Sequence, residues 1–372
     1  FEYPNVGGEQ PADVETYREL GLPAPQAEEA AAVEIPLTGE LLRVGFLPIA
    51  PSAQLFLMVE NGWSRPLGFT IAPRQFVTAE SMADAMADGD VHIGILDGGH
   101  VLAAWERGKP LQIVAAAAID AVGLYATGPT ADLLESGDPA DAIRKHIEAG
   151  GNRLTIASID AESSASAALN IWAFDTLRLT ADELRTPSGD LLPVWRALLR
   201  GRLRAVIAPE PIIASLQAQN PLGRVVADGA RLLTGQPTAV VAVTEESIRI
   251  RRDRIKDYLR LHRRATNALR DDPTVAAEAT ARFAGFNRLR APEMAVALRA
   301  RYSRFADDPG LLVEPMAVMA SYLRREGLLF QDAPPHDVIN DALFREIEAE
   351  DPGETEPAAG PASAPPLPLA PG

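Results

Sequence analysis

Short apolar runs alternate with amphipathic stretches along the chain from residue 42 onward. The first run, residues 42–47, favours a β-strand, and the prolines that follow prevent it from continuing as strand or helix. Residues 53–60 then place apolar side chains at helical spacing and end at Asn61-Gly62, a pair typical of helix C-termini. This pattern predicts a buried strand, a loop and a helix, and such loops hold ligands in α/β proteins.

The same strand, loop and helix unit recurs along the chain. Further strands are predicted at residues 69–76, 91–96, 111–118, 154–158, 205–208 and 238–243. Helices are predicted at residues 81–88, 100–107, 139–149, 163–177 and 191–200, and then at 248–270, 274–283, 292–301 and 315–326. Because strands alternate with helices, we expect parallel sheets.

The order of these elements predicts an α/β protein with two Rossmann-like lobes, a ligand cleft between them and a helical C-terminal part. We place lobe 1 at residues 41–121 plus 236–347 and the inserted lobe 2 at residues 122–235. Residues 1–40 show no sustained periodicity and are expected to form an extended segment. Residues 348–372 are rich in Pro and Ala, and we expect them to be disordered. Two lobes around a cleft suit a clamp that closes on a ligand.

Composition narrows the possible partners. The chain has 372 residues, of which 47% are hydrophobic, so each lobe can bury a core of its own. The net charge of −16 argues against nucleic acid and anionic membranes, which both favour basic surfaces. The sequence contains no cysteine, which excludes disulfides, thiolate nucleophiles and Cys-ligated zinc. The five histidines show no metal-ligand spacing, so no metal site and no cofactor are predicted.

The first residue and the most apolar stretch give expectations about where the protein is located. The chain begins at Phe1 rather than Met, and we expect a processed chain whose signal peptide lies outside this sequence. The most apolar stretch, residues 111–128, is interrupted by Asp120 and Gly123, so no transmembrane span is predicted. The basic runs within residues 249–264 alternate with apolar residues and are interpreted as a solvated helix face.

Three segments carry a resemblance to a known family. They read VGFLPIAPSAQLFLMVENGW at residues 44–63, MADAMADGDVHIGILDGGHVLAAWERGKPLQIVAAA at 82–117 and LLRGRLRAVIAPEP at 198–211. In this order they resemble the nitrate/sulfonate/taurine group of solute-binding proteins of ABC importers, a broad group that includes thiamine-pyrimidine binders. The resemblance covers about residues 42–347.

The resemblance implies a type II periplasmic-binding-protein fold that closes like a Venus flytrap. It further implies a periplasmic location, or one on the outer face of the cytoplasmic membrane, a monomer without enzymatic activity, and docking on the permease and ATPase subunits of an importer. An enzyme on the same fold, of a pyrimidine-precursor or dehydratase type, is the alternative. Catalysis would need a poised acid–base pair in the cleft, and Asp97 with His100 is the only local pair in the candidate loops. A periplasmic sensor partner is a third possibility.

Each candidate ligand-binding loop follows a predicted strand, so the loops are expected to converge on one cleft. The loop at residues 48–54 supplies hydrogen-bonding groups, and the turn at residues 97–100 lets a ligand approach the backbone. The serines within residues 163–166 stand at the start of a helix, where they can bind a ligand together with free N–H groups. The candidate residues are Pro48, Ile49, Ala50, Ser52, Gln54, Asp97, Gly98, His100, Asp120, Ser158, Ser163, Ser164 and Glu210.

Structural alternatives remain open for these residues. Ser52 is equally suited to capping a helix, and Asp97-Gly98 to reversing the chain. One residue of the serine cluster could be a cap while the others are solvated. Glu210, between two prolines, could accept a hydrogen bond from a ligand amine or bridge the lobes.

The charge of the ligand is also open. The candidate loops contain no Lys or Arg, but they contain the carboxylates of Asp97, Asp120, Asp160, Glu162 and Glu210. An amine or a nitrogen heterocycle would fit these carboxylates. A sulfonate-like or nitrate-like anion would instead depend on helix dipoles and serine hydroxyls.

Overall fold

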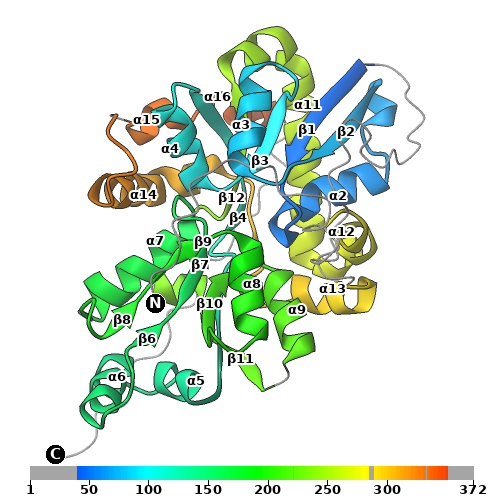
Figure 1. Ribbon diagram of the computed structural model, residues 1–372. Coiled ribbons are helices and arrows are strands. Elements are labelled where there is room, and N and C mark those ends of the chain that lie inside the picture. Colours follow the sequence, from blue (N-terminus) through cyan, green and yellow to red (C-terminus); the bar gives the residue numbers. More distant parts are fainter. Residues whose placement is uncertain (1–39, 221, 285–288, 332, 351–372) are drawn as a thin grey trace, which may run out of the picture.

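Two β-sheets, each covered by helices on both faces, form the body of the protein. The computed structural model describes residues 40–220, 222–284, 289–331 and 333–350. We call the six-stranded sheet with its helices the first lobe and the five-stranded sheet with its helices the second lobe (Figure 1). The expected N-terminal segment up to residue 39 and most of the expected tail lie outside the described residues.

The first lobe contains the strands at both ends of the chain. Its sheet has the order β13-β4-β12-β3-β1-β2. The strands are β1 (Glu40–Phe46), β2 (Phe69–Gln75), β3 (Ile93–Leu96), β4 (Leu111–Ile119), β12 (Ala239–Thr244) and β13 (Arg304–Phe305). The helices are α2 (Ala53–Glu60), α3 (Ala79–Ala87), α4 (Gly98–Glu106), α11 (Glu245–Asp271), α12 (Ala277–Phe283), α13 (Ala291–Leu298), α14 (Val313–Arg325), α15 (Pro335–Val338) and α16 (Ala342–Glu350).

The second lobe is built from the strands between β4 and β12. Its main sheet has the order β11-β5-β10-β7-β9, and β6 pairs with β8 beside it. The strands are β5 (Gly123–Thr127), β6 (Leu154–Thr155), β7 (Ala157–Ile159), β8 (Leu184–Arg185), β9 (Ser188–Gly189), β10 (Ala205–Ala208) and β11 (Gly223–Asp228). The helices are α5 (Gly128–Leu134), α6 (Pro139–Glu148), α7 (Ser164–Asn170), α8 (Leu191–Leu199), α9 (Ile212–Gln219) and α10 (Gly229–Leu232). The lobe boundaries at residues 121 and 236 stay a prediction.

Neither main sheet is purely parallel, and this corrects the sequence-based expectation. In the first lobe β1 pairs in parallel with β2 and β3, but β12 runs antiparallel between β3 and β4. In the second lobe β5 is antiparallel to β10 and β11. The reason is that the chain enters and leaves the second lobe through β5 and β12, which both reverse the strand direction.

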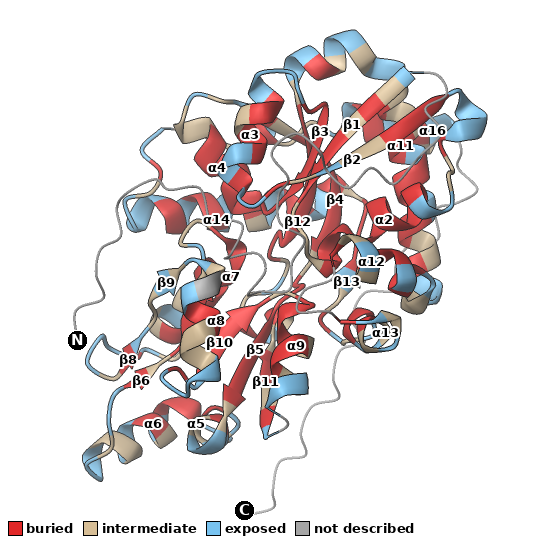
Figure 2. Ribbon diagram, turned by 45° about the vertical axis from the view of Figure 1, so that its right-hand side comes forward, coloured by how far each residue is buried: buried red, intermediate tan, exposed pale blue. Residues whose placement is uncertain are grey.

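Alternation along the strands divides the core into layers. Val241 and Val243 of β12 belong to an apolar cluster with α2, α11 and α12, whereas Val240 and Ala242 belong to one with α3, α4 and α14. In the second lobe one cluster contains residues of α5, α6 and α7, and another contains residues of α8 and α9. Figure 2 shows the buried strands at the centre of each lobe and the exposed outer faces of the helices.

Acidic side chains of α16 neutralise much of the basic face of α11. Arg252 and Lys256 pair with Glu346, and Lys256 and Arg260 pair with Glu350. Arg252 and Arg260 remain exposed, as the interpretation of a solvated face requires. That interpretation is wrong for Arg263, which is buried and pairs with Asp307 and Glu348. The expected start of the tail at residue 348 is also corrected, because α16 extends to Glu350.

The connections between the lobes are joined to each other by Asp120. Its Oδ1 accepts hydrogen bonds from the backbone N–H groups of Gly235 (2.6 Å) and Gln236 (3.1 Å), and its Oδ2 pairs with Arg304. The N–H of Ala121 donates to Thr238 Oγ1 at 2.9 Å. Asp120 therefore stabilises the point where the chain passes between the lobes. Among the described residues, no helix has the length and apolarity that a membrane span requires.

Candidate functional site

The carboxylate of Asp97 joins the two lobes. Asp97 follows β3 and caps α4, where its Oδ1 accepts a hydrogen bond from the N–H of Gly99 at 2.8 Å. The same carboxylate accepts from the backbone N–H of Ser164 (2.9 Å) and from its hydroxyl (2.5 Å). Ser164 is the first residue of α7 in the second lobe, and both side chains are buried. The loops after β3 and β7 therefore meet, as the sequence predicts for loops at the carboxyl ends of strands.

Gly99 allows the lobes to approach each other here. The preceding residue, Gly98, contacts its own lobe, where its N–H donates to the carbonyl of Pro237 at 2.9 Å. A Cβ atom on Gly99 would lie 1.9 Å from the carbonyl oxygen of Glu162 and 2.4 Å from Cε of Met319. Only a residue without a side chain fits between these two neighbours. The Asp97-Gly98-Gly99 segment thus provides close backbone contact with the second lobe, not a plain reversal of the chain.

A second set of contacts between the lobes starts at His100. Its Nε2 lies 2.7 Å from Oδ2 of Asp160, while Oδ1 of Asp160 accepts from the N–H of Glu162 at 3.0 Å. The carboxylate of Glu162 pairs with Arg107, the residue that follows α4, at 3.1 Å. Asp97 and His100, the only local acid–base pair in the candidate loops, therefore have different partners, both in the second lobe. Sequence reasoning named these carboxylates but could not pair them, because Asp160 lies 60 positions after His100.

Burial and neighbouring charges shift the pKa values of these groups. Burial would lower the pKa of His100, but the hydrogen bond to Asp160 and the surrounding carboxylates outweigh it and raise the pKa to about 9. Burial raises the pKa of Asp97 to about 6, although the nearby His100 and the donors of Ser164 act in the opposite direction. For Asp160, burial is outweighed by the hydrogen bond from His100, and its pKa is lowered.

The loop after β1 contacts the second lobe through its backbone. The N–H of Ala50 donates to the carbonyl of Glu210 at 2.8 Å, whereas Pro48 and Ile49 are half-buried. Ser52 lies at the N-terminus of α2, but its hydroxyl donates to the carbonyl of Leu47 (3.3 Å) and does not cap the helix.

Gln54 also forms its contacts inside the first lobe. Its Nε2 donates to the carbonyl of Ala117 at 2.6 Å, and the side chain is fully buried. Ser52 and Gln54 therefore hold α2 in place, and the structure does not bring them together with Asp97.

Glu210 bridges the lobes, which is one of the two alternatives that the sequence left open. It follows β10, and its carboxylate accepts from the hydroxyl of Tyr302 (2.5 Å) and from the N–H of Ala214 (2.9 Å). Tyr302 lies between α13 and β13 of the first lobe. Burial raises the pKa of Glu210 to about 7 despite these two donors.

The serines at and near the start of α7 have different roles. Ser163 caps α7 by accepting from the N–H of Ser166 at 3.2 Å. The hydroxyl of Ser166 donates a hydrogen bond to the hydroxyl of Ser158 at 2.6 Å, so Ser158 contacts the first turn of α7. Ser164 is the serine that forms hydrogen bonds to Asp97 of the first lobe.

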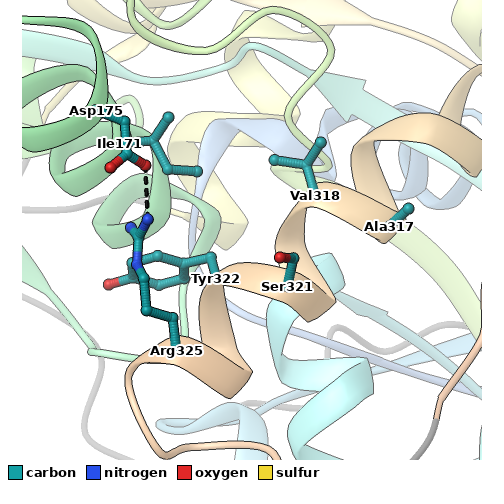
Figure 3. Close-up of a pocket in the computed structure, with 7 residues that line it drawn as sticks. All are labelled: Ile171, Asp175, Ala317, Val318, Ser321, Tyr322 and Arg325. Carbon is teal, nitrogen blue, oxygen red and sulfur yellow. Dashed lines mark hydrogen bonds and ion pairs between the residues drawn. The ribbon is translucent and has the colours of Figure 1, made fainter.

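A groove between the lobes was not foreseen from the sequence. It lies between α14 and a π-helical turn at Ile171–Thr176, has a volume of about 340 Å³ and is crossed by the pair Asp175–Arg325 at 2.7 Å (Figure 3). Tyr322 lines the groove and interacts with Nδ2 of Asn170 at 3.0 Å. These residues come from helix surfaces distant in sequence, so no local pattern could have indicated the groove. The residues that line it are Ile171, Asp175, Ala317, Val318, Ser321, Tyr322 and Arg325.

Comparison with known proteins assigns a family to this architecture. The model of the NMT1-like family matches residues 38–284, more than half of the chain. The chain belongs to the NMT1-like family. No functionally curated protein is significantly similar to it in sequence.

Periplasmic binding proteins are among the solved structures that share this fold. The aliphatic sulphonate binding protein SsuA from Escherichia coli is 16% identical, with a TM-score of 0.65, and covers 83% of this chain and 100% of its own. The nitrate-binding protein NrtA from Synechocystis is 11% identical, with a TM-score of 0.70, and covers 84% and 89%. The alkanesulfonate-binding protein SsuA from Xanthomonas axonopodis is 14% identical, with a TM-score of 0.63, and covers 82% and 99%. The predicted type II periplasmic-binding-protein fold is thereby confirmed.

Proposed function

We propose that this protein is the extracytoplasmic solute-binding component of an ABC importer. In this proposal it captures a small solute between its lobes, performs no chemistry on it, and delivers it to a permease with its ATPase subunits. The observation that supports the proposal most directly is the contact of Asp97 with Ser164, where loops at the strand ends of both lobes close on each other. Solved binding proteins for sulfonates and nitrate share the fold.

The hydrogen bonds between Asp97 and Ser164, and the carboxylates around them, favour one chemical class of solute. The N–H and hydroxyl of Ser164 already donate to the carboxylate of Asp97, so an anion would have to displace that carboxylate. Asp160, Glu162 and Glu210 add negative charge around the interface, and the candidate loops contain no Lys or Arg. We therefore favour a small amine or a nitrogen heterocycle with N–H donors as the solute.

Solute entry requires the lobes to separate. Buried hydrogen bonds between Asp97 and Ser164 leave no room for a solute between these two side chains in the closed form. In an open form the carboxylate of Asp97 would be exposed on the first lobe and free to accept from a solute N–H group. Closure would then trap the solute against the second lobe.

Thermal-shift screening against amines, pyrimidines, sulfonates and nitrate tests the proposal. Only a ligand that binds the folded state raises the melting temperature. We expect an amine or pyrimidine to do so, and Asp97→Asn to weaken that shift. The matched control is Asp88→Asn, an exposed aspartate at the end of α3, which should leave the shift intact.

Two results would count against the proposal. A shift produced only by sulfonates or nitrate would reject the favoured solute class while keeping the transport role. Turnover of a substrate, with no ligand that merely binds, would reject the transport role in favour of an enzyme.

A further inference from the structure

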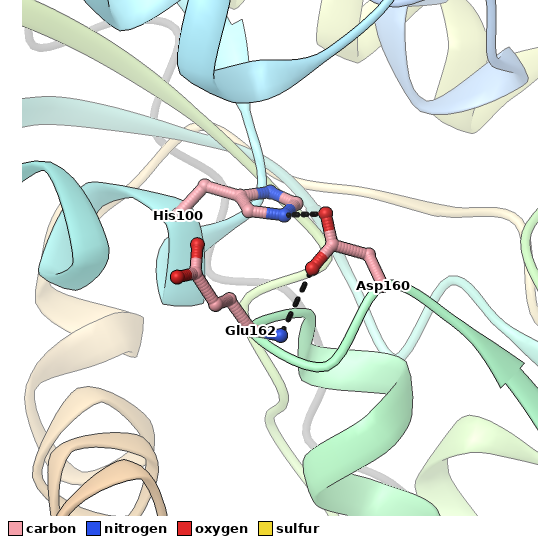
Figure 4. A group of neighbouring side chains, drawn as sticks. All are labelled: His100, Asp160 and Glu162. Carbon is pink, nitrogen blue, oxygen red and sulfur yellow. Dashed lines mark hydrogen bonds and ion pairs between the residues drawn. The ribbon is translucent and has the colours of Figure 1, made fainter. Parts of the chain in front are cut away.

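Three potential metal ligands from opposite lobes lie together at the interface. His100 belongs to α4, whereas Asp160 and Glu162 lie in the loop between β7 and α7. One ligand atom from each residue lies within 4.8 Å of the other two (Figure 4). The local spacing of the histidines predicts no metal site, but this cluster is assembled only by the approach of the two lobes.

The cluster carries a surplus of negative charge. The carboxylates of Asp97, Asp160 and Glu162 all act on His100, and Arg107 pairs with Glu162. With a neutral imidazole, three carboxylates face a single guanidinium. A divalent cation would balance that surplus.

His100 presents its ring to the cluster from a buried position. Its side chain is only 8% exposed, and Nε2 lies 2.7 Å from Oδ2 of Asp160. Nδ1 is buried without a hydrogen-bond partner among the described residues, so a metal ion bound at Nε2 would displace no other hydrogen bond of the ring.

The donor set indicates which class of metal would fit. One imidazole nitrogen and two carboxylate oxygens are typical of Zn²⁺ and similar transition metals, because Ca²⁺ and Mg²⁺ favour sites made only of oxygen. Movements of less than about 1 Å would bring the three atoms to zinc bond lengths of about 2.0–2.2 Å. Asp160 and Glu162 are already oriented, by the N–H of Glu162 and by Arg107.

We propose that His100, Asp160 and Glu162 bind a divalent transition metal ion of the Zn²⁺ class, which clamps the two lobes together. The set of three ligands leaves a coordination position open to water. This site does not depend on the transport role, because it requires only that the lobes close.

Zinc titration of untagged, chelator-treated protein by isothermal calorimetry tests the site. We expect one Zn²⁺ per chain in the wild type, and a loss of affinity of 100-fold or more in His100→Gln and Asp160→Asn. Asp160 has a φ of 65°, a conformation that Asn also tolerates, so the second variant should fold. His336→Gln is the matched control, since this exposed histidine also lies beside an aspartate, Asp337, at 3.6 Å.

Scattering measurements separate the clamp from mere binding. Zinc should decrease the radius of gyration, or stabilise the compact form against opening, in the wild type and in His336→Gln but not in His100→Gln. Stoichiometric zinc binding that survives both His100→Gln and Asp160→Asn would overturn the site. Absence of zinc binding by the wild type would also overturn the site. Zinc binding that has no effect on the compact form would overturn the proposed clamp.

Discussion

The carboxylate of Asp97 occupies the N-terminus of α7 in the opposite lobe, where it accepts hydrogen bonds from both the N–H and the hydroxyl of Ser164. This interaction joins residues 67 positions apart in the sequence. The buried carboxylate of Asp97 thereby contributes to holding the lobes together, beside the contacts of His100 with Asp160 and of Tyr302 with Glu210.

Replacing Asp97 by Asn should weaken closure, because the amide presents N–H groups where the carboxylate accepts two donors. We expect a loss of about 1–3 kcal/mol in the free energy that holds the lobes together. A double-mutant cycle with Ser164→Ala, followed by thermal unfolding and scattering, measures the coupling. A coupling energy near zero would contradict the role of this pair.

Replacing Gly99 by Ala should keep the lobes apart. The new methyl group would lie 1.9 Å from the carbonyl oxygen of Glu162, although Ala itself favours the helical conformation of α4. We expect a larger radius of gyration and a solute affinity at least tenfold lower, which corresponds to about 1.4 kcal/mol. Gly137→Ala is the control, since open space surrounds that position. Equal behaviour of the two variants would show that Gly99 does not limit closure.

Stability should decrease as the pH rises from 6.5 to 9 because of His100. Its pKa is about 9 in the folded protein, against 6.5 for a histidine in an unfolded chain, so the stabilisation is complete below 6.5 and lost as pH passes through 9. The expected contribution is roughly 2–3 kcal/mol in the free energy of unfolding. Urea unfolding at both pH values should show this decrease in the wild type and a smaller one in His100→Gln. An unchanged decrease in that variant would assign the effect to other groups.

Removing the hydroxyl of Tyr302 should destabilise the protein in a pH-dependent way. Tyr302 donates to Glu210, whose pKa is raised to about 7, so the carboxyl group is protonated at pH 5 and charged at pH 8. Tyr302→Phe should therefore cost about 1–3 kcal/mol at pH 8 and less at pH 5.

Tyr322→Phe is the control for this comparison. The hydroxyl of Tyr322 interacts with the neutral amide of Asn170, so its removal should have the same effect at both pH values. If urea unfolding showed parallel losses for the two variants, the charge of Glu210 would not be what Tyr302 stabilises.

Local patterns were sufficient for most of the elements. The apolar run at residues 111–118 and the long amphipathic stretch after residue 248 appear as β4 and α11, because burial along a strand or on one helix face leaves a regular period. Short or exposed elements left no such period. The two-residue strand β13 and the strand β11, which pairs only at one edge of its sheet, were therefore missed.

The sequence by itself determined the α/β class, the loops that follow the strands and the acidic character of those loops, because all three depend on local composition and periodicity. Only the tertiary structure decided that β12 inserts antiparallel between β3 and β4, and that Asp97 pairs with Ser164 and His100 with Asp160. The two side-chain pairs depend on how the lobes approach each other, and the position of β12 depends on the chain returning to the first sheet after the second lobe. No local spacing carries that information.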